Sequence, residues 1–219
     1  MDSDIDILDL IDDWRGRQLL LEEAESIVNA ATAADPTAPR FKAVGTVAPL
    51  PLVRPAWRLL PRPQRRGAYR PSAAPDPEII AELVSRSTEF RSRRWSVAEQ
   101  CVRLLPKDWW SLAHAAYPQL TRIPEYSAGW ADLMLATTRW INERETDWKF
   151  NDAKEKMGSL RLSTHGILEA ASDQVIDAAE HLGSHICQVC GAPGGQAGDF
   201  MTLCGPHRDD KGWRLTGHE

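Results

Sequence analysis

Four residues near the C-terminal end have the types and the spacing of a metal-binding centre. Two cysteines stand three positions apart, and after thirteen further residues a third cysteine is followed three positions later by a histidine: Cys187, Cys190, Cys204 and His207. Gly191 and Gly205 each follow a cysteine directly, which suits tight turns whose backbone amides point at the thiolates. Three thiolates and one imidazole complete a tetrahedron around Zn²⁺ and leave no ligand position for water. The pattern therefore predicts a structural zinc ion.

Two other chemistries could use the same cysteines, namely disulfide formation and a redox-active C-x-x-C motif. The first requires an oxidising compartment, and the second normally belongs to a βαβ unit, which the sequence around Cys187 does not suggest. The thirteen-residue spacer is slightly shorter than the usual spacing of about 15–20 residues. The remaining cysteine, Cys101, falls in an apolar helical pattern and is expected to be a buried, inert thiol.

A second group of charged residues superficially resembles a nuclease site. Asp152, Glu155 and Lys156 offer the two carboxylates and the lysine that such a site places around a metal ion. A metal-dependent nuclease is therefore a remote alternative, and a charged hairpin edge that discourages strand addition is the simpler interpretation. Because there is no G-x-S-x-G motif and no other catalytic constellation, we assign no catalytic residues and expect no enzymatic activity.

The sequence pattern of the segments that precede and position the cysteines predicts an α+β fold. We expect a helical middle, one β-hairpin and a C-terminal helix leading into a zinc ribbon. Apolar alternation on both sides of Met157-Gly158 predicts the hairpin over 147–164, and helical spacing predicts the helix over 167–186. In the middle, Asp76-Pro77 is typical of a helix start. A capping-box pattern from Ser96 to Glu99 predicts a second helix, ending by Pro106, and a third runs from Trp109 to Tyr117.

The pattern of residues 1–34 predicts an acidic helix, and the net charge of this segment is −7. Gly16 could split this helix in two. Six aspartates lie within the first thirteen residues. Carboxylates are favourable at a helix N-terminus because of its positive dipole end. An acidic arm that docks on a basic partner and, more remotely, a calcium site are the alternatives.

Residues 35–77 predict an extended, basic arm or linker. Ten of the fifteen prolines lie here, and the net charge of this segment is +6. Proline prevents a continuous helix and favours extended backbone, yet the segment is more apolar than a solvated linker needs to be. It could pack on its own domain, which we place at residues 78–219, bind another protein, or contact a nucleic-acid backbone.

Two sets of residues follow as candidate contact sites. For a protein partner, possibly a toxin, the candidates are the apolar residues of the arm and one tryptophan pair: Leu50, Leu52, Val53, Trp57, Leu59, Leu60, Trp109 and Trp110. Trp57 is the best candidate hot spot. Neighbouring helix residues point about 100° apart, so one of Trp109 and Trp110 could be an exposed anchor for a partner; the alternative is that both belong to the core. For a nucleic acid, the candidates are arginines: Arg62, Arg65, Arg66, Arg70, Arg91, Arg93 and Arg94.

Composition excludes several classes of protein. Apolar residues make up 42% and charged residues 26%, as in ordinary globular chains. No apolar run approaches the roughly 18 residues that a membrane helix needs. The net charge of −5 gives no general attraction to nucleic acids. The first ten residues are acidic where a secretory signal would be basic, so we expect a cytoplasmic protein.

The stretch from about 128 to 208 resembles a bacterial and phage family. It has a Lys154-Glu-Lys-Met-Gly-Ser-Leu-Arg161 hairpin, a helix, and then Cys-x-x-Cys-Gly-Ala-Pro and Leu-Cys-x-x-His. The family commonly has Lys-Glu-Lys-Phe-Gly-Gly-Leu-Arg in the hairpin, so Met157 and Ser159 depart from it. The resemblance implies an accessory protein of prophages or toxin systems, without an assigned catalytic activity.

These observations favour a non-enzymatic protein-binding module with a structural zinc ion, of the antitoxin or immunity type. A zinc-ribbon regulator that binds DNA or RNA is the alternative. Against it, the predicted ribbon has few basic residues, and acidic ones accompany them.

Overall fold

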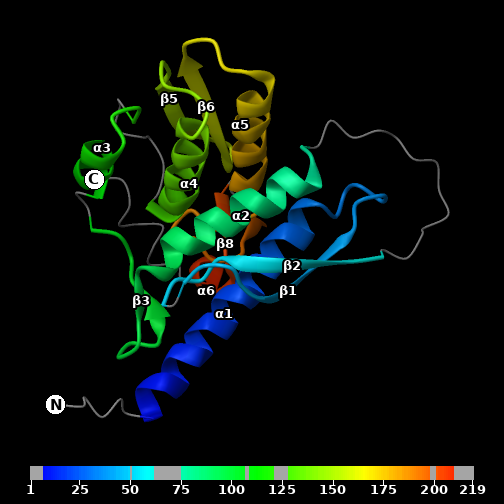
Figure 1. Ribbon diagram of the computed structural model, residues 1–219, viewed down its shortest axis with the longest axis vertical. Coiled ribbons are helices and arrows are strands. Elements are labelled where there is room, and N and C mark those ends of the chain that lie inside the picture. The colour runs from blue at the N-terminus through cyan, green and yellow to red at the C-terminus, as the bar shows by residue number, and fades with distance from the viewer. Residues whose placement is uncertain are drawn as a thin grey trace.

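The computed structural model, shown in Figure 1, describes residues 7–49, 51–61, 75–106, 109–120, 128–197 and 201–209. The helices are α1 (Ile7–Ala31), α2 (Pro77–Ser92), α3 (Trp109–Ala116), the 3-10 turn η1 (Ala128–Trp130), α4 (Ala131–Asn142), α5 (Ala170–Gly183) and α6 (Gly205–Asp209). The strands are β1 (Arg40–Thr46), β2 (Pro55–Leu60), β3 (Trp95–Ser96), β4 (Cys101–Val102), β5 (Lys149–Lys156), β6 (Ser159–His165), β7 (Gly195–Ala197) and β8 (Met201–Leu203). The predicted α+β class is confirmed.

Helix α2 lies at the centre of the core and packs against α1, α4 and α5. Figure 1 shows it crossing the molecule between α1 below and α4 and α5 above. Its start follows the sequence prediction, because the Asp76 carboxylate accepts a hydrogen bond from the Glu78 amide at 2.8 Å and Pro77 occupies the first turn. Buried side chains from all four helices, including Val28, Leu83, Met134 and Leu182, belong to one hydrophobic cluster.

The prediction of an extended arm over 35–77 is wrong for residues 40–60, which form an antiparallel hairpin of β1 and β2. The hairpin packs on α1 and α2, with Phe41 only 3% exposed. Proline is tolerated because Pro49 lies in the connecting loop and Pro55 begins a strand, positions where a missing amide donor costs little. Leu50 and residues 62–74 of the predicted arm lie outside the described residues.

The helix predicted over 96–106 is also wrong. Ser96 still accepts a hydrogen bond from the amide of Glu99, at 3.3 Å, but this bond closes a short turn between β3 and β4 instead of starting a helix. Gln100 adopts a left-handed conformation with φ of 52°, which ends the turn and starts β4. Cys101 is exposed, contrary to the expectation of a buried thiol.

The hairpin predicted over 147–164 is confirmed as β5 and β6. Met157 and Gly158 form its turn, with φ of 53° and 79°, as two-residue hairpin turns require. The prediction of a single hairpin is wrong, because the described residues contain four two-stranded antiparallel sheets. Strands β3, β4, β7 and β8 are only two or three residues long, and β1 and β2 lie within the proline-rich stretch of residues 35–77, so their alternation gave no clear strand pattern.

Candidate metal centre

The four predicted ligands lie together at the end of α5. Cys187 and Cys190 belong to a turn that follows this helix, Cys204 follows β8, and His207 lies on α6. Their ligand atoms all lie within 4.8 Å of one another. The Sγ atoms of Cys190 and Cys204 are 3.8 Å apart, and His207 Nδ1 is 3.6 Å from Cys187 Sγ and 3.0 Å from Cys204 Sγ.

Two of these three separations fit the edges of a tetrahedron around a zinc-sized ion. Zinc bonds of about 2.3 Å to sulfur and 2.0–2.1 Å to nitrogen place two sulfurs about 3.8 Å apart, and a sulfur and a nitrogen about 3.6 Å apart. Two of the three measured pairs match these lengths, and the Cys204–His207 pair is closer. The donor set thus has the size and the chemistry for one tetrahedral metal ion.

The turn around the first two ligands depends on Gly191. Its amide donates to the carbonyl of Cys187 at 2.9 Å, and its φ of 76° lies in the left-handed region. A Cβ atom here would also lie 2.9 Å from the carbonyl oxygen of Gly129. Gly205 is different: it begins α6, and a Cβ would meet nothing within 4 Å, so the structure does not require glycine there.

The surroundings of Cys187 favour the thiolate form of its side chain. A hydrogen bond from the Cys190 thiol lowers the pKa of Cys187 to about 4, and backbone amides add to this effect. The same hydrogen bond, followed by burial, raises the pKa of Cys190. Burial raises the pKa of Cys204. A negative charge already present at the cluster favours a cation between the four ligands.

The cysteine cluster is part of the main body of the protein. The amide of Gly129 donates to the Gln188 carbonyl at 2.8 Å, and the Trp130 indole donates to the Ile186 carbonyl at 3.0 Å. On the other side, the Thr202 hydroxyl donates to the carbonyl of Gly158 in the β5–β6 turn at 2.8 Å. The sequence did not predict these contacts, because they join segments far apart along the chain.

Most of the predicted protein-binding residues of the arm are used internally. Val53 is 1% exposed, and the Trp57 indole donates to the hydroxyl of Ser85 on α2 at 2.7 Å. Leu52 and Leu60 are half-buried, and Leu59 is 51% exposed. Of these residues, therefore, Leu59 alone offers a largely exposed side chain, and Leu50 lies outside the described part of the chain.

The tryptophan pair on α3 shares one environment. The rings of Trp109 and Trp110 meet edge to face with their centroids 5.5 Å apart, and both are half-buried against the core. The prediction that one of them is an exposed anchor is therefore wrong. Leu112 on the same helix is the exposed apolar residue, at 66%.

Two of the arginines proposed for nucleic acid serve the fold. Arg91 pairs with Glu23 of α1 at 3.1 Å, and Arg94 pairs with the buried Asp132 of α4. Burial raises the pKa of Asp132, and Arg94 and Arg91 oppose this shift. Arg93 is 49% exposed in its side chain and pairs with Glu89. Arg62, Arg65, Arg66 and Arg70 lie outside the described residues.

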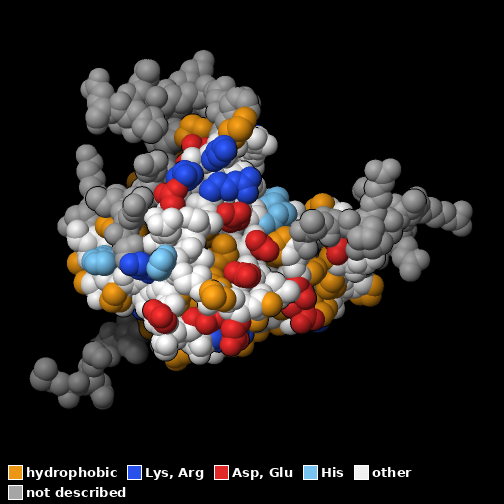
Figure 2. Space-filling model, turned by 90° about the horizontal axis from the view of Figure 1, so that it is seen from above, with side chains coloured by type: hydrophobic (Ala, Val, Ile, Leu, Met, Phe, Trp, Pro, Cys, Tyr) orange, Lys and Arg blue, Asp and Glu red, His pale blue; other side chains and the backbone are white. Residues whose placement is uncertain are grey.

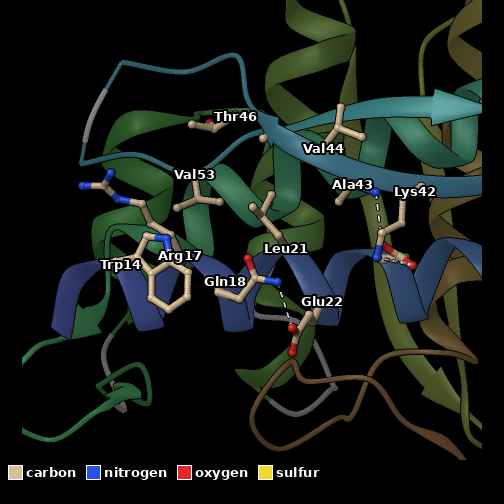
Figure 3. A pocket seen from close by; sticks show the side chains of 12 residues that line it. Trp14, Arg17, Gln18, Leu21, Glu22, Lys42, Ala43, Val44, Thr46 and Val53 are labelled. Atoms are coloured by element: carbon tan, nitrogen blue, oxygen red, sulfur yellow. Dashed lines mark hydrogen bonds and ion pairs between the residues drawn. The ribbon is translucent and has the colours of Figure 1, made fainter. Parts of the chain in front are cut away.

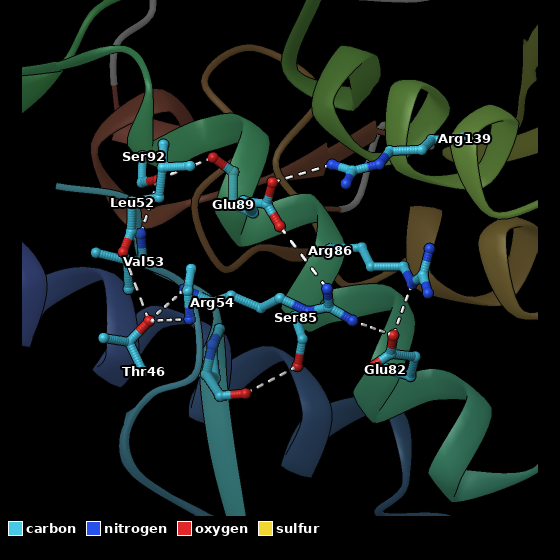
Figure 4. Close-up of polar contacts among 12 residues, drawn as sticks. Thr46, Leu52, Val53, Arg54, Glu82, Ser85, Arg86, Glu89, Ser92 and Arg139 are labelled. Atoms are coloured by element: carbon cyan, nitrogen blue, oxygen red, sulfur yellow. Dashed lines mark hydrogen bonds and ion pairs between the residues drawn. The ribbon is translucent and has the colours of Figure 1, made fainter. Parts of the chain in front are cut away.

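An ion-pair network that the sequence did not reveal joins the first hairpin to α2 (Figure 4). Arg54 contacts Glu82 at 2.5 Å and Glu89 at 3.9 Å. Arg86 pairs with Glu82, and Arg139 of α4 pairs with Glu89 at 3.0 Å. The stretch around Arg54, which the sequence suggested as part of a partner-binding arm, is therefore fixed to α2 of its own chain by these ion pairs.

The three residues of the nuclease hypothesis do not form a site. Asp152 pairs with Lys154 at 2.5 Å, and Glu155 accepts a hydrogen bond from the amide of Gly158 in the turn. Residues at odd spacing on a strand point to opposite faces, so the two carboxylates diverge. In the part of the chain that the structure describes, the ligands of the cysteine cluster are the only group that could hold a metal.

A groove that the sequence analysis missed runs between α1 and the β1–β2 hairpin (Figure 3). Its volume is about 330 Å³. Trp14, 63% exposed, and Arg17 lie at one end, Lys42 lies at the other, and Val44, 54% exposed, overhangs it from β1. In the sequence, the apolar Trp14 in an otherwise acidic helix was the one indication of this groove. The wall opposite α1 could not be predicted, because it is formed by the β1–β2 hairpin.

Comparison with known proteins adds no relative: no family model, curated protein or solved structure matches this chain. In the described residues, no helix is both long and apolar enough to cross a membrane.

Proposed function

We propose that this protein is a non-enzymatic protein-binding module, of the antitoxin or immunity type, whose fold is stabilised by one structural zinc ion. The observation that supports the zinc ion is the Cys3His cluster, in which two of the three measured ligand pairs have tetrahedral edge lengths. Four protein ligands leave no open position, so a bound ion would serve stability and not catalysis.

The zinc assignment is tested by metal analysis of the purified full-length protein. We expect one zinc ion per chain in the wild type and a loss of tightly bound zinc in Cys190→Ser. Cys101→Ser is the matched control, because Cys101 is exposed and lies outside the cluster. His207→Cys, which restores a four-ligand set, should keep zinc. Undiminished zinc in Cys190→Ser would refute the assignment.

The groove between α1 and β1 supports the binding role. Trp14 is exposed at its end, and tryptophan is the residue type most enriched among interface hot spots. Val44 and Val47, 54% and 66% exposed, add apolar surface on and beside β1. Glu22 and Lys42 line the groove and provide polar groups that can fix the register of a partner.

The protein-binding role is tested with the products of adjacent genes, because toxins and their antagonists are commonly encoded together. We expect one of them to form a stable complex with the full-length protein. Trp14→Ala should weaken this complex about 30-fold, as loss of a hot spot worth about 2 kcal/mol implies. Leu112→Ala, at an equally exposed site on α3, should leave affinity unchanged. If no adjacent product binds, or if both variants bind like the wild type, the role is not supported.

A further inference from the structure

The outer face of the β1–β2 hairpin carries three exposed cations, Arg40, Lys42 and Arg58. Phe41 turns the other way, into the core, where its ring meets Trp57 edge to face. Since side chains alternate along a strand, Arg40 and Lys42 share the opposite face. The strand register places Arg58 directly across from Lys42.

This arrangement is unfavourable for the isolated protein. Directly opposed residues of an antiparallel pair have Cβ atoms about 4.5–5.5 Å apart, and like charges at that distance destabilise a sheet. Glu25 on α1 compensates Lys42, at 3.0 Å. Among the described residues, Arg40 and Arg58 form no ion pair. An external anion would remove the repulsion between the cations.

The charged groups elsewhere are arranged differently. Arg54 and Arg86, for example, are paired with carboxylates at 2.5 and 2.6 Å. On the face shown in Figure 2, most of the basic side chains gather in one group, with acidic side chains next to them and over the rest of the face. Directly after β2 the sequence continues with arginines at 62, 65, 66 and 70. The excess of cations at the hairpin is therefore local, in a chain whose net charge is −5.

We propose that Arg40, Lys42 and Arg58 on this face bind the phosphate backbone of a nucleic acid. Guanidinium groups donate two parallel hydrogen bonds to phosphate oxygens, which makes arginine well suited to this ligand. The other side chains that alternation places on this face of β2, Ala56 and Leu60, are apolar, so no polar group is available there to read base edges. Binding is therefore independent of sequence. Binding does not depend on the zinc ion, and Lys42 is the one of the three cations that also lines the groove.

The test measures binding of the full-length protein to fluorescent 20-mers of mixed sequence, as duplex DNA, single-stranded DNA and RNA. The variant replaces all three cations: Arg40→Gln, Lys42→Gln and Arg58→Gln. The matched control removes the same charge from other exposed positions: Arg144→Gln, Lys149→Gln and Lys156→Gln. Affinity is measured at several salt concentrations, and melting temperatures verify that both variants fold.

We expect micromolar affinity of the wild type at low salt for at least one of the 20-mers. The hairpin variant should reduce the slope of log affinity against log salt by about 2–3, because each phosphate contact contributes about 0.7–0.9. Its melting temperature should change little, since removing the opposed charges relieves repulsion while Lys42→Gln gives up the ion pair with Glu25. Three results overturn the proposal: no binding at low salt, an equal loss in the control variant, or displacement of the nucleic acid by poly-glutamate at equal charge, which would indicate an acidic protein ligand.

Discussion

The α-carbon of Gly16 lies directly against the indole ring of Trp95. A Cβ atom at this position would be 2.2 Å from Cε2 and 2.5 Å from Nε1 of that ring. Glycine in a helix interior costs about 1 kcal/mol relative to alanine, yet α1 continues through it. Gly16 is thus required for close packing of α1 on β3, and it does not break the helix.

Gly16→Ala should therefore destabilise the protein by about 1–3 kcal/mol, the usual cost of overpacking, despite the better helix propensity of alanine. Urea denaturation measures the change. Trp95→Leu provides the control background, because a smaller side chain leaves room for the methyl group and should reduce or reverse the penalty. Equal effects of Gly16→Ala in both backgrounds would show that the indole is not responsible.

The side chain of Asn29 joins α1 to β1 by two hydrogen bonds. Its Nδ2 donates to the Phe41 carbonyl at 2.7 Å, and its Oδ1 accepts from the Phe41 amide at 3.0 Å. The amide side chain thus takes the place of a third strand at the edge of the hairpin. Glu25 continues this pairing two residues further along β1, accepting from the amide of Ala43 at 3.1 Å.

Asn29→Leu should cost about 1–3 kcal/mol, because it leaves both backbone groups of Phe41 without partners. Asn29→Asp keeps the acceptor and loses the donor, so we expect an intermediate loss at neutral pH. Hydrogen exchange of the Phe41 amide reports the contact directly: it should be faster in Asn29→Leu and remain protected in Asn29→Asp. Unchanged protection in Asn29→Leu would contradict the pairing.

Local signals in the sequence predicted part of this structure. The Asp76-Pro77 helix start, the Met157-Gly158 turn and the Cys3His grouping each depend on neighbouring residues or on a standard ligand spacing, and all three are present. The hairpin of 40–60 was not predictable in this way. Its strands are held in place by Asn29, Ser85 and Ser92 of two helices, which accept hydrogen bonds from the Phe41 amide, the Trp57 indole and the Val53 amide. Those contacts span 12 to 39 residues of the chain.

The ion pairs of Glu89 predict a pH dependence of stability. Burial alone would raise the pKa of Glu89, but hydrogen bonds and charges from Arg139 and Arg93 hold it below its ordinary value of 4.5. A folded-state pKa below the unfolded one means that this carboxylate stabilises the protein above about pH 4.5 and loses that effect as the pH falls further.

Glu89→Gln should therefore be less stable than the wild type by about 1–2 kcal/mol at pH 7, with the difference shrinking below pH 4.5. Thermal denaturation from pH 3 to 7 measures both. Glu99→Gln is the control, because Glu99 pairs with Arg103 on the exposed surface. The stability of this variant should differ little from that of the wild type between pH 3 and 7. A constant difference for Glu89→Gln across the range would exclude the electrostatic explanation.

The turn residue Met157 is strained. Its φ of 53° is unfavourable for a side chain without local hydrogen bonds, and the side chain is 57% exposed, so packing does not require methionine. Asn-Gly is the preferred pair for this turn. Met157→Asn should therefore raise the stability by about 0.5–1 kcal/mol, measured by denaturant unfolding. Met157→Val, which is β-branched, should lower it. Equal stability of the two variants would show that the turn is not strained.

Arg91 links the turn that carries the first two candidate metal ligands to α1. Its guanidinium donates to the carbonyl of Cys190 and also pairs with Glu23 at 3.1 Å, so one side chain links α2, α1 and the first ligand turn. The backbone of that turn is further held by Gly129 and Trp130 of η1. If the proposed zinc ion orders the turn, its removal must weaken contacts far beyond the four ligands.

Chelation of the metal should therefore lower the stability of the whole protein and not only of the C-terminal segment. Hydrogen exchange should increase in α1 near Glu23 and in α2 near Arg91, as well as around Cys187, because the carbonyl of Cys190 no longer fixes Arg91. Arg91→Met interrupts this link while keeping an apolar stem, so chelation of this variant should no longer affect α1. Faster exchange confined to residues 184–209 in the wild type would show instead that the metal centre folds as an independent unit.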